Sequence, residues 1–259
     1  MFDISSIGPA DILPFIAVGF AAQMVDGALG MAFGVLSQTM MVSLLGVPPA
    51  TASAGVHLVE IFTTGASGAS HIAHRNVDWR LFWRLVPAGV IGGATGAYLL
   101  SNIDASVARP FVMIYLALIG VYLLYKAIRL GSVPRFRDPQ MTPPLALAGG
   151  FLDAAGGGGW GPVVTSNLLI QGSDPRRTVG TVNAAEFLLT LTISATFITT
   201  LGFAVFSTAI VGLIIGGVVA APFGAILAKR MKPRVLLASV ATILIATSVF
   251  SITQAWPIF

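Results

Sequence analysis

Apolar residues dominate this chain in long runs that are separated by short polar stretches. Reading the runs between breakers gives eight apolar segments, near 12–46, 50–73, 81–101, 107–128, 143–171, 177–201, 204–228 and 235–254. A helix of about 20 residues crosses the hydrocarbon core of a bilayer. The runs lack the alternation of a membrane barrel strand, so the pattern predicts membrane-spanning helices.

The first and fifth segments differ from the others because they are longer and glycine interrupts them. The first contains Gly27, Gly30 and Gly34, and the fifth contains the run 156–159 and Gly161-Pro162. Inside a helix each glycine costs about 1 kcal/mol relative to alanine, and a proline costs about 3 kcal/mol. Both segments are therefore predicted to break inside the membrane.

The same two segments resemble each other in sequence. Residues 25–34 align without gaps on residues 152–161, which pairs Asp26 with Asp153. After a one-residue deletion, residues 46–60 align on 172–186, which pairs Glu60 with Glu186. The chain is read as a duplication with one membrane repeat in residues 1–138 and a second in 139–259.

The basic residues test whether the broken segments cross the membrane or return to the same face. If all eight segments cross, the two sides receive seven basic residues each, whereas a re-entrant fifth segment gives thirteen against Arg109 alone. The positive-inside rule favours the second arrangement, with basic loops in the cytoplasm and the C-terminus outside. The first segment has no basic residue before it, so charge leaves open whether it crosses or returns.

Symmetry favours a first segment that is also re-entrant. Each half then holds one broken hairpin and three transmembrane helices, and this odd number inserts the halves with opposite orientation. The predicted fold is an all-α integral membrane protein with an inverted repeat, an architecture found in secondary transporters.

Composition excludes a soluble protein. Charged residues make up only 9% of the 259 residues, against about 25% in soluble domains. The formal net charge is +4, but the basic residues lie in short loops, which indicates topology and no nucleic-acid partner. The chain has no cysteine, which excludes disulfides and thiolate metal sites.

The broken segments offer an anion site that needs no buried arginine or lysine. Proline is favoured at the first helical position, so a half-helix is predicted to start at Trp160-Gly161-Pro162, with its amides and positive dipole end toward an anion. The first hairpin offers the same elements. The alternative reading is that the glycines only allow close packing. The candidate ligand residues are Gly34, Gln38, Gly158, Gly159, Trp160, Gly161 and Thr165.

Acidic side chains inside spans are costly and mark function by default. Glu60 follows His57 and Glu186 follows Asn183 at equivalent places, and a carboxyl group there can carry a proton or accept hydrogen bonds from hairpin amides. Asp26 and Asp153 are expected to cap the broken helices. His57 with Glu60 has a helical spacing that suits a metal, but no further ligands converge, so no metal and no cofactor is expected.

Three stretches resemble the TauE/SafE sulfite exporter family, also called the toluene sulfonate uptake permease family. They are Gly19-Phe20 with residues 26–34, the motif of residues 149–162, and residues 180–186. The resemblance implies a bacterial inner-membrane permease for sulfite, a sulfonate or a related organosulfur anion, commonly moved outward. On the family's pattern Asn183 and Glu186 are the polar site positions, with His57 and Glu60 as internal counterparts.

Two other functions compete with a carrier. An intramembrane enzyme would need Asp26, His57 and Glu60 to converge, but no catalytic signature is present, so no catalytic residue is expected. An anion channel would need an open polar path. The expected partners are a small sulfur-containing anion and the lipid bilayer, and the oligomeric state is left open, with a homo-oligomer among the alternatives.

Overall fold

The computed structural model describes residues 12–29, 31–129, 139–202, 208–230 and 233–255. Regular structure in these ranges is helical, without a strand. The helices are α1 (Ile12–Leu29), α2 (Phe33–Ser43), α3 (Pro49–Ala73), α4 (Trp79–Ser101), α5 (Ala105–Arg129), α6 (Thr142–Gly156), the π-helical segment η3 (Trp160–Thr165), α7 (Ser166–Ile170), α8 (Pro175–Leu201), α9 (Thr208–Arg230) and α10 (Pro233–Ala255).

The helices follow the apolar segments closely. The segment predicted near 50–73 is α3, the one near 107–128 is α5, and the first and fifth segments are each divided by a break as predicted. Gly30, the basic residues Arg135, Arg137 and Lys232, and the repeat boundary after residue 138 lie outside the described residues.

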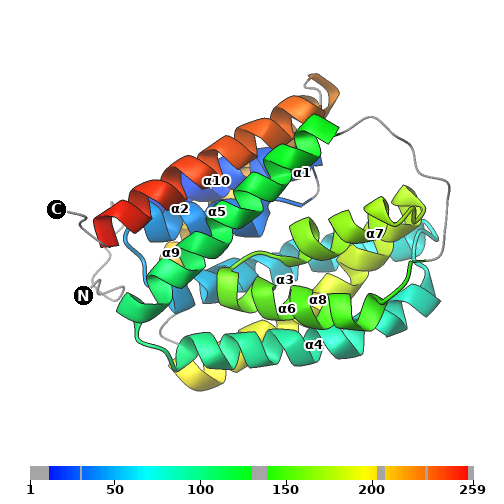
Figure 1. The fold of residues 1–259 in the computed structure, drawn as a ribbon. Helices are drawn as coiled ribbons and strands as arrows, with labels where there is room; N and C mark the ends of the chain where they lie inside the picture. The colour runs from blue at the N-terminus through cyan, green and yellow to red at the C-terminus, as the bar shows by residue number, and fades with distance from the viewer. Residues whose placement is uncertain (1–11, 30, 130–138, 203–207, 231–232, 256–259) are drawn as a thin grey trace.

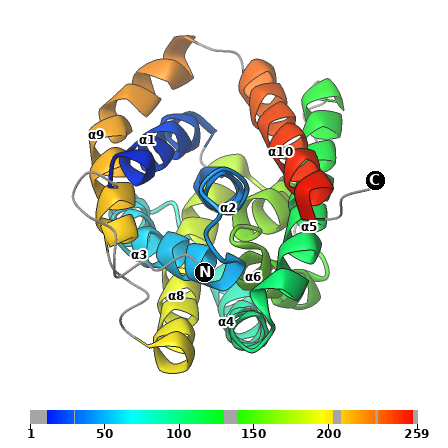
Figure 2. The same cartoon turned by 90° about the vertical axis from the view of Figure 1, so that its left-hand side faces the viewer.

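The first break separates α1, which ends at Leu29, from α2, which begins at Phe33. Figure 2 shows α2 near the centre of the bundle with other helices around it. Ten of its eleven residues are buried, including the polar residues Ser37, Gln38 and Thr39. The first hairpin therefore carries polar groups into the interior of the molecule.

The second break separates α6 from η3 and α7. Gly157 and Gly158 have φ angles of +72° and +152°, a range that residues with a side chain rarely adopt. In Figure 1, α6 runs into the bundle and α7 runs back toward the end from which α6 came. The glycine run thus produces a chain reversal inside the protein.

Four helix pairs make most of the packing: α1 with α9, α4 with α6, α3 with α8, and α5 with α10. Small residues allow the close approaches. A Cβ atom added at Gly92 of α4 would lie 2.1 Å from the carbonyl oxygen of Leu147, and one at Gly216 of α9 would lie 2.1 Å from that of Ile16. Such contacts are typical of helix packing in membranes.

Arg109, the lone basic residue predicted on the outer side, has a structural partner. Its Nη2 donates to the carbonyl oxygen of Val42 at 2.8 Å, and its Nε donates to Ser251 Oγ at 3.3 Å. An arginine that binds the last carbonyl groups of a helix interacts favourably with the negative end of the helix dipole. Arg109 therefore caps the C-terminal end of α2.

Two helices in the described part of the chain, Ala105–Arg129 and Arg177–Leu201, are long and apolar enough to cross a membrane by length and composition. The breaks explain why the hairpin helices are shorter. α2 has 11 residues and α6 has 15, against about 20 for a full span. The hairpins reach the interior only as pairs of short helices.

Candidate functional site

The two breaks lie against each other. A Cβ atom added at Gly158 would lie 2.3 Å from the amide nitrogen of Val35, and one added at Gly161 would lie 2.9 Å from Cβ of Met31. Gly158 thus lies against Val35, and the later residue Gly161 lies against the earlier residue Met31. The second break therefore runs antiparallel to the start of α2. The glycines therefore serve packing, and a larger residue at Gly158 would disturb both breaks.

Asp26 closes the first break. Its Oδ1 accepts hydrogen bonds from the amides of Ala32 at 2.7 Å and Phe33 at 3.1 Å. These are the first amides of the resumed helix, which have no acceptor within the helix itself. A carboxylate at this point also interacts favourably with the positive end of the α2 dipole.

Asp153 does the same at the second break. Its Oδ1 accepts from the amides of Gly159 at 2.6 Å and Trp160 at 2.9 Å. The two aspartates occupy equivalent positions of the sequence repeat and make equivalent contacts. The aspartates thus cap both breaks, and a capping role for Glu60 and Glu186 stays a prediction.

His57 holds the second oxygen of Asp153. The histidine is fully buried, its Nδ1 lies 2.7 Å from the carbonyl oxygen of Ser53, and its Nε2 lies 3.1 Å from Asp153 Oδ2. A carbonyl oxygen can only accept, so Nδ1 carries a hydrogen. The contact with Asp153 then holds a hydrogen bond only when a proton lies on Nε2 or on Oδ2. Asp153 is therefore held through both carboxylate oxygens, by the amides of the break on Oδ1 and by His57 on Oδ2.

Capping leaves amides without an acceptor at both breaks. The amides of Val35 and Gly161 lie in the first turns of the resumed helices and donate to no residue that the structure describes. Both residues line the cavity described next. Fewer amides thus remain for a ligand than the sequence suggested, because the aspartates already bind the others.

A cavity of about 320 Å³ lies where the two breaks meet, between α3 and α8. It takes residues from both halves of the chain, and a space of this size accommodates a small anion with water. Its walls are lined by Gln23, Asp26, Met31, Phe33, Gly34, Val35, Glu60, Thr63, Thr64, Ser67, His71, Asp153, Gly158, Gly159, Gly161, Pro162, Thr165, Val179, Asn183 and Glu186.

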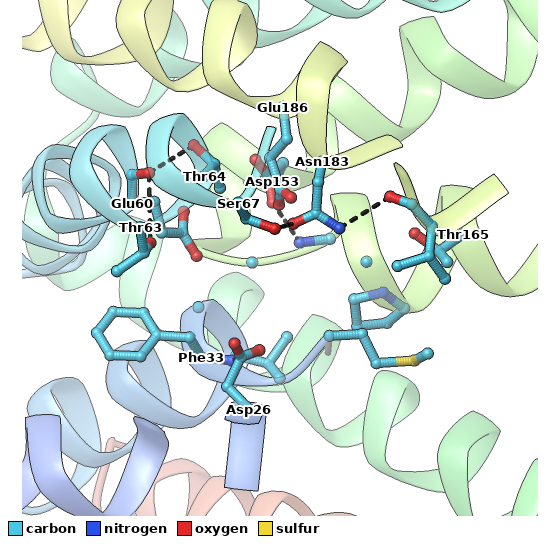
Figure 3. A pocket seen from close by; sticks show the side chains of 18 of the residues that line it. Asp26, Phe33, Glu60, Thr63, Thr64, Ser67, Asp153, Thr165, Asn183 and Glu186 are labelled. Carbon is cyan, nitrogen blue, oxygen red and sulfur yellow. Dashed lines mark hydrogen bonds between the residues drawn. The ribbon is translucent and has the colours of Figure 1, made fainter. Parts of the chain in front are cut away.

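The cavity is rich in carboxyl groups. Figure 3 shows Glu60 on α3 and Glu186 on α8, with Asp26 across the cavity from them. Glu60 is only 7% exposed, and its Oε2 has no hydrogen-bond partner within the described part of the chain. A buried polar atom without a partner is costly, so it marks a place where a proton or a ligand completes the site.

Six of the nine predicted ligand residues line the cavity, namely Gly34, Gly158, Gly159, Gly161, Thr165 and Asn183. The other three lie behind its wall. Gln38 donates from Nε2 to the carbonyl oxygen of Pro49 at 3.1 Å, His57 binds Asp153, and Trp160 donates from Nε1 to the carbonyl oxygen of Val182 at 3.2 Å. These three side chains support the breaks from behind.

Sequence reasoning missed the polar face of α3. Thr64, Ser67 and His71 line the cavity together with Glu60. They follow Glu60 at intervals of four, seven and eleven residues, which is the spacing of one helix face. That periodicity, read outward from the glutamate, is the signal that identifies them.

Lys126 lies beside the cavity, although it is not among the residues that line it. It lies in the last turn of α5 and is half-buried. Its Nζ donates to Ser166 Oγ at 2.7 Å and lies 3.9 Å from the sulfur of Met31. The sequence placed Lys126 among the loop cations because its apolar segment ends there, but the side chain reaches inward.

Comparison with known proteins identifies the family. The profile described as "Sulfite exporter TauE/SafE" matches residues 15–251. The chain belongs to the TauE/SafE family. A curated relative, the "Probable membrane transporter protein YtnM" of Bacillus subtilis (strain 168), is 39% identical over 259 aligned residues, which cover 95% of this chain and 84% of that protein. No solved structure matches the chain.

Membership of the TauE/SafE family assigns the general activity. The chain is a membrane transporter and not an enzyme, which agrees with the absence of a catalytic signature in the sequence. The cavity at the two breaks is the candidate site for the transported molecule, because both halves and all four repeat-related acids meet there.

Proposed function

We propose that this TauE/SafE protein is a secondary transporter, with export the expected direction, that carries sulfite, a sulfonate or a related small organosulfur anion together with protons. The family description supports the substrate class, and the relative's name supports transport. The observation that best supports the proposal is a cavity of about 320 Å³ where the two backbone breaks meet. Free amides and buried carboxyl groups lie together there.

The proton coupling follows from charge. Two like charges 4 Å apart repel by about 4 kcal/mol at an effective dielectric constant near 20. Asp153 Oδ2 lies 3.1 Å from Nε2 of His57, whereas Asp26, Glu60 and Glu186 form no salt bridge within the described part of the chain. An anion binds beside these groups favourably when Glu60 and Glu186 are protonated. Binding of the anion and of protons is therefore cooperative.

The helix pairing supports a duplicated fold. Exchange of the two halves replaces α1 by α6, α3 by α8, α4 by α9 and α5 by α10. The pair α1–α9 then becomes α6–α4, while the pairs α3–α8 and α5–α10 each become themselves. This is the pattern of a two-fold axis through the α3–α8 and α5–α10 contacts. It supports the division into repeats 1–138 and 139–259.

The basic residues support an inner-membrane orientation. The end of α3, the start of α4, the end of α5 and the start of α8 gather at one end of the bundle in Figure 1. Arg75, Arg80, Arg129 and Arg177 lie there, whereas Arg109 lies at the other end. The positive-inside rule makes the first end cytoplasmic and the C-terminus of α10 external.

Purified protein in liposomes tests the proposal. The substrate should be an arylsulfonate, because its charge stays constant across the pH range and only the protein titrates. Uptake that saturates with concentration, and that increases when the outside is made acidic relative to the inside, is the expected result. Flux that rises linearly with concentration indicates an anion channel, and saturable flux that ignores the pH gradient removes the proton coupling.

A further inference from the structure

Lys126 sits among hydrogen-bond donors with no carboxylate partner. Its Nζ donates to Ser166 Oγ at 2.7 Å, and no acidic side chain in the described part of the chain pairs with it. The Tyr122 hydroxyl, one helical turn earlier, faces Ser166 as well. That hydroxyl is buried and makes no well-formed hydrogen bond to a described residue.

The position of Lys126 is not that of an ordinary helix-end lysine. Long basic side chains at helix ends usually extend toward the membrane surface, where water solvates the charge. Arg129 behaves in this way, since it is exposed and lies over the Tyr125 ring with 5.5 Å to the ring centroid. Lys126 instead reaches Ser166, which is fully buried.

A half-buried ammonium group without an acid lacks its counter-charge, and burial without one is unfavourable. Ser166 accepts from Lys126 and donates to the sulfur of Met31 at 3.8 Å. The Tyr122 hydroxyl is therefore the neighbouring donor still without an acceptor in the described part of the chain, and the missing component is an acceptor with negative charge. An ammonium group and a hydroxyl placed in this way suit an oxyanion with several oxygens, because each oxygen can accept a separate hydrogen bond.

The cluster adjoins the cavity. Met31, whose sulfur lies 3.9 Å from Lys126 Nζ, is part of the cavity wall, and Ser166 directly follows the wall residue Thr165. Lys126 also lies near the end of α5 that carries the proposed cytoplasmic basic residues. An anion that moves between the cytoplasm and the cavity would meet this charge before it meets the carboxyl groups.

We propose that Lys126, Tyr122 and Ser166 form a second anion subsite, which receives the sulfur oxyanion on the cytoplasmic side of the cavity. This inference rests on the proposed transport of such anions. The subsite attracts the anion with a fixed positive charge, and the cavity then binds it together with protons. Lys126 is thus a specificity residue for anions.

Kinetics in liposomes, with protein oriented for entry from the cytoplasmic side, test the subsite through Lys126→Met. This variant keeps the length of the side chain and removes its charge. A hydrogen bond to a charged group is strong enough that its loss should raise KM for an arylsulfonate roughly tenfold or more, with a smaller change in the maximal rate. Lys126→Arg should restore most of the affinity, and Arg129→Gln serves as the matched control with unchanged KM.

Tyr122→Phe keeps the test decisive if Lys126→Met does not fold, because it removes one buried hydroxyl and no packing. It should raise KM severalfold. Unchanged KM in Lys126→Met, or in Tyr122→Phe where the first variant cannot be purified, overturns the subsite while leaving the transport function intact. A wild type that shows no saturable flux of any sulfur oxyanion overturns the proposed function instead.

In that case, thermal stabilisation of the purified wild type by sulfite still tests the subsite. Stabilisation that Lys126→Met abolishes supports the subsite. Stabilisation that persists in Lys126→Met, or no stabilisation of the wild type, overturns it.

Discussion

Single residues in the cavity fall into two groups that differ in their partners. Asp26 and Asp153 each bind two backbone amides, so their oxygens are largely satisfied. Glu60 has a buried oxygen without a partner. Glu186 occupies the equivalent position in the second half, on the facing helix. The aspartates therefore hold the breaks, and in the proposed function the glutamates are the groups that exchange protons.

The glutamates should carry the coupling. Glu186→Gln removes a proton-accepting group but preserves size, so we expect uptake driven by a proton gradient to fall by roughly tenfold or more, with normal insertion and folding. Glu186→Asp, which keeps the carboxyl group, serves as the control and should retain partial coupling. Uptake by Glu186→Gln at the wild-type rate would exclude this residue from the mechanism.

The aspartates should contribute unequally to stability. Loss of a helix cap costs about 1 kcal/mol, and Asp26→Ala should show an effect of that size. Asp153→Ala also leaves Nε2 of the buried His57 without a partner, which adds about 1–3 kcal/mol. Thermal unfolding in detergent should rank wild type above Asp26→Ala and Asp26→Ala above Asp153→Ala. The reverse order of the two variants would contradict a stabilising contact between His57 and Asp153.

Sequence predicted these residues to different degrees for physical reasons. The caps were predictable because Asp26 and Asp153 precede a resumed helix by a short, fixed interval. The position of Gln38 and His57 behind the cavity wall could not be predicted. It depends on which faces of the helices pack against each other. Lys126 was misread because its contact with Ser166 joins positions 40 residues apart.

At the scale of the elements, close packing of glycine faces holds the hairpins in place. α9 approaches α1 through Gly216, where an added Cβ would lie 2.1 Å from a backbone oxygen, whereas the nearest atom at Gly217 is 3.9 Å away. Gly216 therefore packs directly on the backbone of α1, whereas Gly217 has room for a methyl group. The broken helices were predictable from their glycines, but the antiparallel contact between the two breaks was not, since it joins distant parts of the chain.

This pair of glycines gives a matched test of the packing. Gly216→Ala forces a clash with backbone atoms that cannot move independently, and overpacking of this kind costs about 1–3 kcal/mol. Gly217→Ala has room and gains helix propensity of up to about 1 kcal/mol. Unfolding temperatures in detergent should fall for the first variant and stay level or rise for the second. Equal temperatures would show that α1 and α9 pack less closely than described.

At the scale of the whole molecule, Arg75, Arg80, Arg129 and Arg177 lie at one end and Arg109 at the other, and the absence of cysteine from the sequence makes the orientation easy to measure. His74, after α3, and Asn102, after α4, are exposed and lie at opposite ends of α4. The sequence predicted this arrangement from charge alone, because the positive-inside rule needs only the order of segments and loops. How far the hairpins enter the bundle could not be predicted from charge, because they carry few charged residues.

Single cysteines should report the two faces. With the proposed orientation, a membrane-impermeant maleimide should label Asn102→Cys from outside the cytoplasmic membrane and label His74→Cys only after the membrane is opened. Labelling is read by mass shift on gels, with the cysteine-free wild type as the blank. The opposite pattern would invert the molecule, and labelling of both in intact cells would show that the residues share a face.

The cavity follows α3 in one direction only, from Glu60 to His71. In the other direction the interior is filled by His57 and by Phe197, whose ring centroid lies 6.4 Å from that of His57. In the proposed orientation, a bulky membrane-impermeant blocker shaped for this space would stop transport when added to the cytoplasmic face. The same compound added outside would be inert, because buried side chains fill the interior on that side.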